Sequence, residues 1–205
     1  RLVVGEVDLV AAAATESGIP RELSARLGYV AAGPAPTYAL PLLLDDAALP
    51  LASRCVPTDE MRSQIERCAR EATVDLALME RSLSTFSGGE RAAAAALVAL
   101  VASPDLLIVD EPTTALDVTV QSEVLQTINE LVKQHDTSLI FISHDLPVVS
   151  TMVETIAVMQ SGNCVEQASM SALFDQPQHE YSKRLVDLAR ATQNRFTTFT
   201  TKATS

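Results

Sequence analysis

Two continuous apolar runs, with an amphipathic stretch between them, constrain the fold of this chain more than any other feature. The runs "DLLIVD" and "TSLIFIS" have the pattern of strands that are buried on both faces of a parallel sheet. The stretch "VTVQSEVLQTINELVKQ" places Val120, Val124 and Ile128 at helical spacing. A strand, a crossover helix and a second parallel strand form a βαβ unit. We therefore predict an α/β core with parallel strands at 105–110 and 138–143.

Acidic and imidazole side chains follow the two predicted strands. Asp110 and Glu111 end the first strand, in "LLIVDEP", and His144 follows the second, in "LIFISHD". The carboxyl ends of parallel strands share one edge of the sheet, where α/β proteins bind their ligands. Neighbouring side chains on a strand point to opposite sides, so one acid can hold Mg²⁺ while the other orients or deprotonates an attacking water. The alternative is a strand that simply ends in a polar loop, with a structural or exposed His144.

The motif "SGGE" at 87–90 predicts the start of a helix. Ser87 and Glu90 fit a capping box, in which each side chain binds a backbone amide of the other residue. A second interpretation uses the same physics, because a helix start presents free amides and the positive end of the helix dipole. Gly88 and Gly89 would let an anion approach that backbone closely. The helix behind the motif, "RAAAAALVALVA", is apolar all round, which predicts a buried helix and is compatible with both interpretations.

The composition excludes several classes of function. The 205 residues carry a formal net charge of −11, with a pI of about 4.6, so nucleic acid is not predicted as a partner. Cys55, Cys68 and Cys164 have no CxxC spacing, which disfavours a disulfide framework and a zinc site. The longest apolar run, 92–102, is much shorter than the roughly 20 residues that span a bilayer.

Shorter patterns account for the rest of the chain. We predict a strand or strand pair in "RLVVGEVDLVA", a strand in "LGYV" after a short helical turn, and a helix in "TDEMRSQIERCAREA". A hairpin is predicted around Ser161–Asn163, and two short helices are predicted on either side of Pro177. The tail "RFTTFTTKATS" is rich in Thr and has no periodicity, so we expect it to be mobile.

The order of these motifs resembles the nucleotide-binding domain of ABC-type ATPases, over most of residues 80–170. In this resemblance "SGGE" matches the signature loop, with Glu90 where Gln is commoner. The string "DEPTTALD" makes it very unlikely that the agreement arises by chance. The resemblance implies an incomplete P-loop NTPase core, with ATP and Mg²⁺ as cofactors. It implies nucleotide contacts for Ser87, Gly88, Gly89, Glu90 and the D-loop residue Asp117.

The resemblance also implies roles for the residues at the strand ends. Asp110 matches the Walker B aspartate, which holds the metal, and Glu111 matches the catalytic glutamate. His144 matches the switch histidine, and 114–117 matches the D-loop. The implied domains are partial core strands with a Q-loop-like region at 1–36, a helical subdomain ending in the signature helix at 37–102, an α/β core at 103–178, and a C-terminal extension with a mobile tail at 179–205.

The segment "QPQHEYSKRLVDL" narrows the resemblance. It is similar to the P-x-H-P-Y-T-x-x-L segment of the oligopeptide, dipeptide and nickel importer ATPases. Pro177, His179, Tyr181 and Leu185 match this segment, while "E" and "S" replace its second Pro and its Thr. A surface helix with incidental similarity is the alternative.

Two departures from the family concern catalysis. No Gly is followed by Lys, and the first lysine is Lys133, so the P-loop lysine is absent and the chain is expected to begin downstream of it. The Q-loop glutamine would fall near Ala32, whose methyl group cannot contact Mg²⁺ or water. We therefore expect the isolated chain to be inactive, although the family is one of ATPases.

Three functions remain open from the sequence. The first is an ATP-binding subunit, or part of one, that powers an importer of peptide-like or nickel-type substrates. It would pair with a second ABC nucleotide-binding domain and with transmembrane permease subunits, at the cytoplasmic face of the cell membrane. The second is a non-hydrolysing module that contributes only its signature side to the site of a partner. The third is an SMC-type chromosome-maintenance head, which the acidic charge and the missing heptads disfavour.

Overall fold

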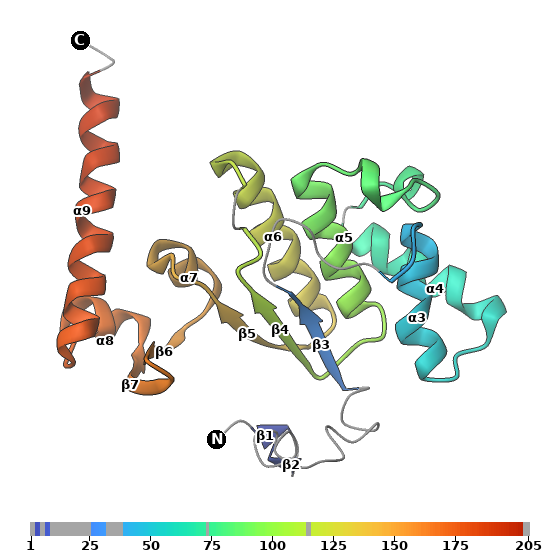
Figure 1. The fold of residues 1–205 in the computed structure, drawn as a ribbon, viewed down its shortest axis with the longest axis horizontal. Helices are drawn as coiled ribbons and strands as arrows, with labels where there is room; N and C mark the ends of the chain where they lie inside the picture. The colour runs from blue at the N-terminus through green and yellow to red at the C-terminus, as the bar shows by residue number, and fades with distance from the viewer. Residues whose placement is uncertain are drawn as a thin grey trace. The chain divides into compact units, whose positions relative to one another are not determined.

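The computed structural model describes residues 26–31, 39–72, 74–113 and 116–191 in full; beyond these it describes only the backbone of short strands near the N-terminus and of a helix as far as residue 202. The chain divides into two compact units, Arg1–Ile142 and Ser143–Ser205 (Figure 1), and each is described by itself. The domain boundaries at 36, 102 and 178 stay predictions.

The first unit is built on a parallel sheet. Strands β3 (Leu27–Val30), β4 (Leu106–Asp110) and β5 (Ser138–Ile142) lie in that order, and both pairs are parallel. Helix α6 (Val118–Gln134) connects β4 to β5. The predicted α/β core and its βαβ unit are therefore confirmed.

Helices α5 (Gly88–Leu100) and α6 pack against one face of this sheet (Figure 1). The approach is close at Gly28, where an added Cβ would lie 2.7 Å from the carbonyl oxygen of Ala99 in α5. Leu107 and Val109 are two residues apart on β4, so their side chains point to the same side, toward the helices, and both are fully buried.

The opposite face differs from the prediction of two buried faces. Tyr29 is 59% exposed and Ile142 is 45% exposed. The two-residue alternation of a strand turns these side chains away from the face that α5 and α6 cover, so these helices do not bury them.

A largely helical stretch joins β3 to α5. It contains α3 (Leu43–Ser53), α4 (Thr58–Glu71) and two single 3-10 turns, η1 (Leu76–Leu78) and η2 (Leu83–Thr85). The helix from Thr58 confirms its prediction. Helix α3 was not predicted, because "LLDDAALPLAS" contains Pro50 inside the helix and lacks a regular polar face.

A buried carboxylate fixes the chain just before α3. Asp46 is 5% exposed, and its Oδ1 accepts hydrogen bonds from the backbone N–H groups of Ala39 (2.8 Å) and Leu40 (2.9 Å). A buried carboxylate requires such donors, since burial without them is strongly unfavourable.

The second unit combines a hairpin with three helices. Strands β6 (Thr155–Gln160) and β7 (Asn163–Ser169) pair in the antiparallel sense, and Ser161 and Gly162 have φ values of 49° and 82° in the turn. This confirms the predicted hairpin, because two successive residues with positive φ are typical of a type I′ turn. The helices are α7 (Leu146–Met152), α8 (Met170–Asp175) and α9 (Glu180–Lys202).

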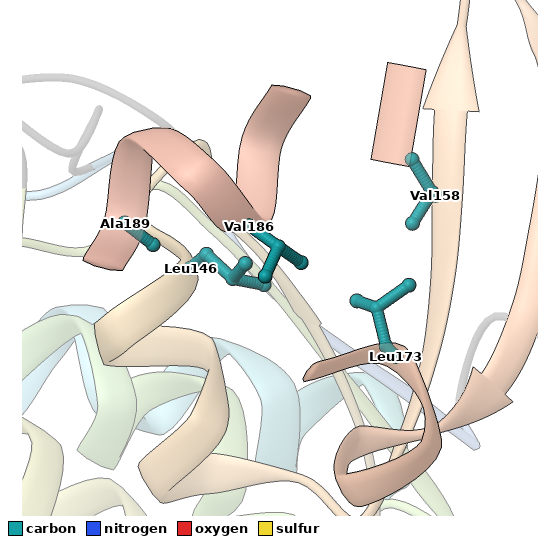
Figure 2. Packing of buried hydrophobic residues seen from close by; sticks show 5 residues of the cluster. All are labelled: Leu146, Val158, Leu173, Val186 and Ala189. Carbon is teal, nitrogen blue, oxygen red and sulfur yellow. The ribbon is translucent and has the colours of Figure 1, made fainter. Parts of the chain in front are cut away.

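Five side chains form the core of the second unit, and they come from α7, β6, α8 and α9 (Figure 2). They are Leu146, Val158, Leu173, Val186 and Ala189. The two helices predicted on either side of Pro177 are present as α8 and α9, but α9 continues to Lys202, through residues that have no periodic pattern.

The N-terminal prediction is met in part. The backbone of β1 (Val3–Val4) pairs with that of β2 (Val7–Asp8) in the antiparallel sense, as the predicted strand pair requires. The helical turn before "LGYV" and the Q-loop position Ala32 lie outside the described residues.

Candidate functional site

The predicted capping box is present at the start of α5. The backbone N–H of Ser87 donates to Oε2 of Glu90 at 2.7 Å, and the N–H of Glu90 donates to Oγ of Ser87 at 3.3 Å. The first of these bonds is the main cause that holds the pKa of Glu90 below its usual value. Helix geometry leaves the N–H groups of Gly88 and Gly89, in the same turn, without an intrahelical acceptor.

Arg81 supports this turn from outside the motif. Its Nη1 lies 3.2 Å from Oε1 of Glu90, so both carboxylate oxygens of Glu90 have a partner. The guanidinium also lies 5.3 Å from the ring centroid of Phe86, a cation–π distance. No sequence motif points to Arg81, because its contacts depend on the path of the chain through η2.

The two glycines of the motif are in close contact with the segment that begins α6. An added Cβ on Gly88 would lie 2.6 Å from Cδ2 of Leu116, and one on Gly89 would lie 2.6 Å from Cγ1 of Val120. Real Cβ atoms essentially never approach a heavy atom this closely. The structure thus brings the predicted signature loop and the end of the predicted D-loop together.

The acidic pair lies at the carboxyl end of β4, as predicted, but its two residues have different conformations. Asp110 is the last residue of the strand, and its Oδ2 lies 3.5 Å from the hydroxyl of Tyr29 on β3. Glu111 has a φ of 46°, and its N–H donates to the carbonyl of Ile142 at 2.9 Å. The predicted alternation of the two side chains along an extended strand is therefore wrong for Glu111, since the extended conformation ends at Asp110.

The structure describes only part of the predicted D-loop, 114–117. Thr114 and Ala115 lie outside the described residues. Asp117 caps α6, with its Oδ1 accepting from the N–H of Val120 at 3.0 Å, and the N–H of Leu116 donates to the carbonyl of Thr113 at 3.1 Å. The carboxylate of Asp117 thus has a structural partner, and its contact with a nucleotide stays a prediction.

His144 belongs to the second unit and follows β5 by two residues. Its function beside Asp110 and Glu111 stays a prediction. The segment that suggested peptide and nickel importers begins α9 in the same unit, where Nδ1 of His179 accepts from the N–H of Tyr181 at 3.1 Å. The carboxylate of Glu166, on β7, accepts from the N–H groups of Gln178 and His179, both at 2.9 Å.

The described residues offer limited ligands for a metal. Across ranges 26–31, 39–72, 74–113 and 116–191, no group of three or more His, Cys, Asp or Glu side chains is arranged to hold a metal ion. A single carboxylate such as Asp110 still fits Mg²⁺, which commonly takes its other ligands from waters and phosphate oxygens. Among the described helices, none is long and apolar enough to cross a bilayer.

A family model matches residues 72–150, a range that contains the capping box, the acidic pair and His144. Its description is "AAA domain, putative AbiEii toxin, Type IV TA system".

Two curated relatives match about half of the chain. The oligopeptide transport ATP-binding protein OppD of Bacillus subtilis (strain 168) is 48% identical over 97 residues, which are 47% of this chain and 27% of that protein. The dipeptide transport ATP-binding protein DppD of the same organism is 46% identical over 101 residues, which are 49% of this chain and 30% of that protein. The matched part of the chain thus spans less than a third of either relative.

A solved structure shares the fold. The ATP-binding cassette MJ0796, in a dimeric post-hydrolysis state bound to ADP and Pi, superposes with a TM-score of 0.60 and 22% identity. The match covers 71% of this chain and 63% of that chain.

Proposed function

Because the chain belongs to the ABC-type nucleotide-binding domains, we propose that it is the ATP-binding subunit, or part of one, that powers an importer of peptide-like or nickel-type substrates. The observation that carries the proposal is the contact between the capped start of α5 and the segment 116–120, which follows the acidic pair. The similarity to OppD and DppD, whose names state oligopeptide and dipeptide transport, supports the substrate class.

The ATP site would be shared with a second nucleotide-binding domain. Ser87, Gly88 and Gly89 would face the phosphates held by that partner, because the free N–H groups and the positive dipole end of α5 attract an anion. Glu90 would act indirectly, since its carboxylate is bound to the N–H of Ser87 and to Arg81. Asp117 would hold the start of α6 against this loop.

The acidic edge of the sheet would serve a second ATP molecule. Mg²⁺, when bound, would neutralise charge on the phosphates, and Asp110 would hold it directly or through water. Glu111 would orient the attacking water, and His144 would contact the terminal phosphate. These functions require a phosphate-binding loop, which no Gly–Lys pair in this chain supplies.

The proposed partners are a second ABC nucleotide-binding domain and transmembrane permease subunits. The chain would then lie at the cytoplasmic face of the cell membrane. A non-hydrolysing module that contributes only its signature side is the second candidate, and the specific observation in its favour is Ala32, which stands near the position of the Q-loop glutamine. An SMC-type head has less support, because the relatives are transport proteins.

Ser87→Arg tests the proposal. The long cation removes the cap and fills the approach to Gly88 and Gly89, so ATP-dependent association with a nucleotide-binding domain that has its own glycine-rich loop should be lost. Ser169→Arg is the matched control, because Ser169 caps α8 through the N–H of Ala172. Sedimentation velocity with and without ATP measures association, and circular dichroism checks the fold. Equal ATP-dependent association of Ser87→Arg and the parent would contradict a signature function.

A further inference from the structure

Gly88 and Gly89 have little space beside them, although their backbone conformation does not itself require glycine. Among the described glycines, only Gly162 has a positive φ. Alanine is favoured over glycine at positions with an ordinary helical backbone, chiefly because it restricts the unfolded chain. At 88 and 89, however, an added Cβ would lie 2.6 Å from Leu116 and 2.6 Å from Val120, respectively.

We infer that Leu116 and Val120 are positioning residues for the start of α5. Each side chain occupies the volume beside one glycine, so together they set where the N–H groups of the first turn point. This inference rests on the proposed function, because it gives that turn a task in binding phosphate.

The two positioning side chains are themselves anchored to the segment after the acidic pair. The N–H of Val120 binds Asp117, and the N–H of Leu116 binds the carbonyl of Thr113. Glu111 begins this segment, and its N–H is fixed to Ile142 in the sheet. A displacement of the segment would therefore move Leu116 and Val120, and with them the start of α5. The consequence is that the acidic edge of this chain and the loop it offers to a partner are mechanically linked.

Paired substitutions test the inference, by adding a methyl group at each glycine and shortening the side chain that faces it. Gly89→Ala, made in the full chain, should lower the folding equilibrium constant by roughly tenfold, because it overpacks against the stiff, β-branched side chain of Val120. Gly88→Ala should cost less, because the atom that it meets is the far end of the flexible Leu116 side chain. The same glycine substitutions should leave the folding equilibrium constant unchanged or raise it slightly when the facing side chain is already shortened, because the facing methyl groups are gone. These matched pairs are Gly89→Ala in the Val120→Ala variant and Gly88→Ala in the Leu116→Ala variant. The crossed pairs, Gly89→Ala with Leu116→Ala and Gly88→Ala with Val120→Ala, should show no rescue. Val118→Ala controls for the helix itself, since Val118 is 77% exposed.

Two measurements without nucleotide decide the packing. Denaturant unfolding gives the equilibrium constants, and hydrogen exchange of the amides at 88–91 reports on the first turn directly. Rescue by matched pairs and not by crossed pairs supports the inference. A neutral or stabilising Gly89→Ala in the parent, or equal rescue by crossed pairs, overturns it.

A third measurement separates positioning from stability. Val120→Ala should raise the ATP concentration for half-maximal association with the partner domain by roughly tenfold, as expected for a lost contact of about 1.4 kcal/mol. Val186→Ala, which truncates a 1% exposed valine in the second unit, should destabilise the chain without this shift. An equal shift for both variants would overturn the positioning function. If the parent itself shows no ATP-dependent association, the proposed function fails, whereas the paired substitutions without nucleotide still decide the packing.

Discussion

The N–H of Glu111 donates to the carbonyl of Ile142 at 2.9 Å, although Glu111 has a φ of 46°. The hydrogen-bonded ladder between β4 and β5 thus continues one step beyond the extended conformation of β4. A left-handed backbone costs a residue with a Cβ roughly 1–2 kcal/mol. The residue proposed to orient water therefore stands in a strained conformation, as is common at functional sites.

Glu111→Gly should unfold with a free energy up to about 1 kcal/mol higher than that of Glu111→Ala, because both variants lose the side chain but glycine adopts positive φ readily. Glu111→Ala keeps the Cβ and with it the cost of the left-handed backbone. Once a glycine-rich loop is supplied upstream of the chain, both variants should abolish phosphate release at this acidic edge. Urea unfolding and a phosphate-release assay measure the two effects. A glycine variant less stable than the alanine variant would contradict the strain.

The capping box should make stability depend on pH through Glu90. Its pKa is lowered in the folded chain, first by the N–H of Ser87, so the ionised form is the one that stabilises the fold. This contribution is complete above the unfolded pKa of about 4.3 and is lost as the pH falls through the lower folded value. The difference in unfolding free energy between the parent and Glu90→Gln should be constant near neutral pH and should vanish in acid. A difference that grows in acid would contradict the assignment.

Asp46→Ala should destabilise the chain by roughly 1–2 kcal/mol, because the backbone N–H groups of Ala39 and Leu40 lose a part-buried carboxylate acceptor. Asp45→Ala is the matched control, since Asp45 is the preceding residue of α3 and is exposed. Its effect should stay within about 0.5 kcal/mol. Denaturant unfolding of both variants measures the difference, and equal effects would show that the buried carboxylate has no special function.

The isolated chain should not bind MgATP tightly. The start of α5 supplies roughly 1 kcal/mol toward an anion, whereas Asp110 and Glu111 repel phosphate unless Mg²⁺ intervenes. Lys133, the first lysine of the chain, lies in the last turn of α6 and cannot replace the lysine of a glycine-rich loop. Calorimetric titration and phosphate release measure binding and turnover. Micromolar binding with release that depends on Glu111 would reveal a phosphate site other than those described above.

Features with local causes could be predicted from the sequence. The box between Ser87 and Glu90 spans a single helical turn, and the hairpin at Gly162 depends on two residues with positive φ. The parallel strands followed from apolar runs on either side of a periodic helix. Each of these signals lies within a short window of sequence.

Features that depend on distant contacts could not be predicted. The steric relation of Gly88 to Leu116 joins the first residue of α5 to a residue that precedes α6, and a glycine pair has the same letters whether it makes room for a ligand or for a leucine. Helix α3 forms despite Pro50, because the buried Asp46 and the surrounding packing outweigh local propensity. The left-handed backbone conformation of Glu111 accompanies the hydrogen bond from its N–H to Ile142 on β5, which the local sequence does not reveal.

The register of the sheet has a consequence for synthesis of the chain. Strand β3 pairs with β4 through Leu27 and Leu106, and its partner strand leaves the ribosome about 75 residues later, which corresponds to roughly 4–15 s of synthesis. We expect β3 to lack β4, its partner among the described strands, during this interval, and limited proteolysis of stalled nascent chains that end before and after β4 would detect its protection. The helical stretch between the strands can form meanwhile, so we expect the parallel sheet of β3, β4 and β5 to be completed after those helices.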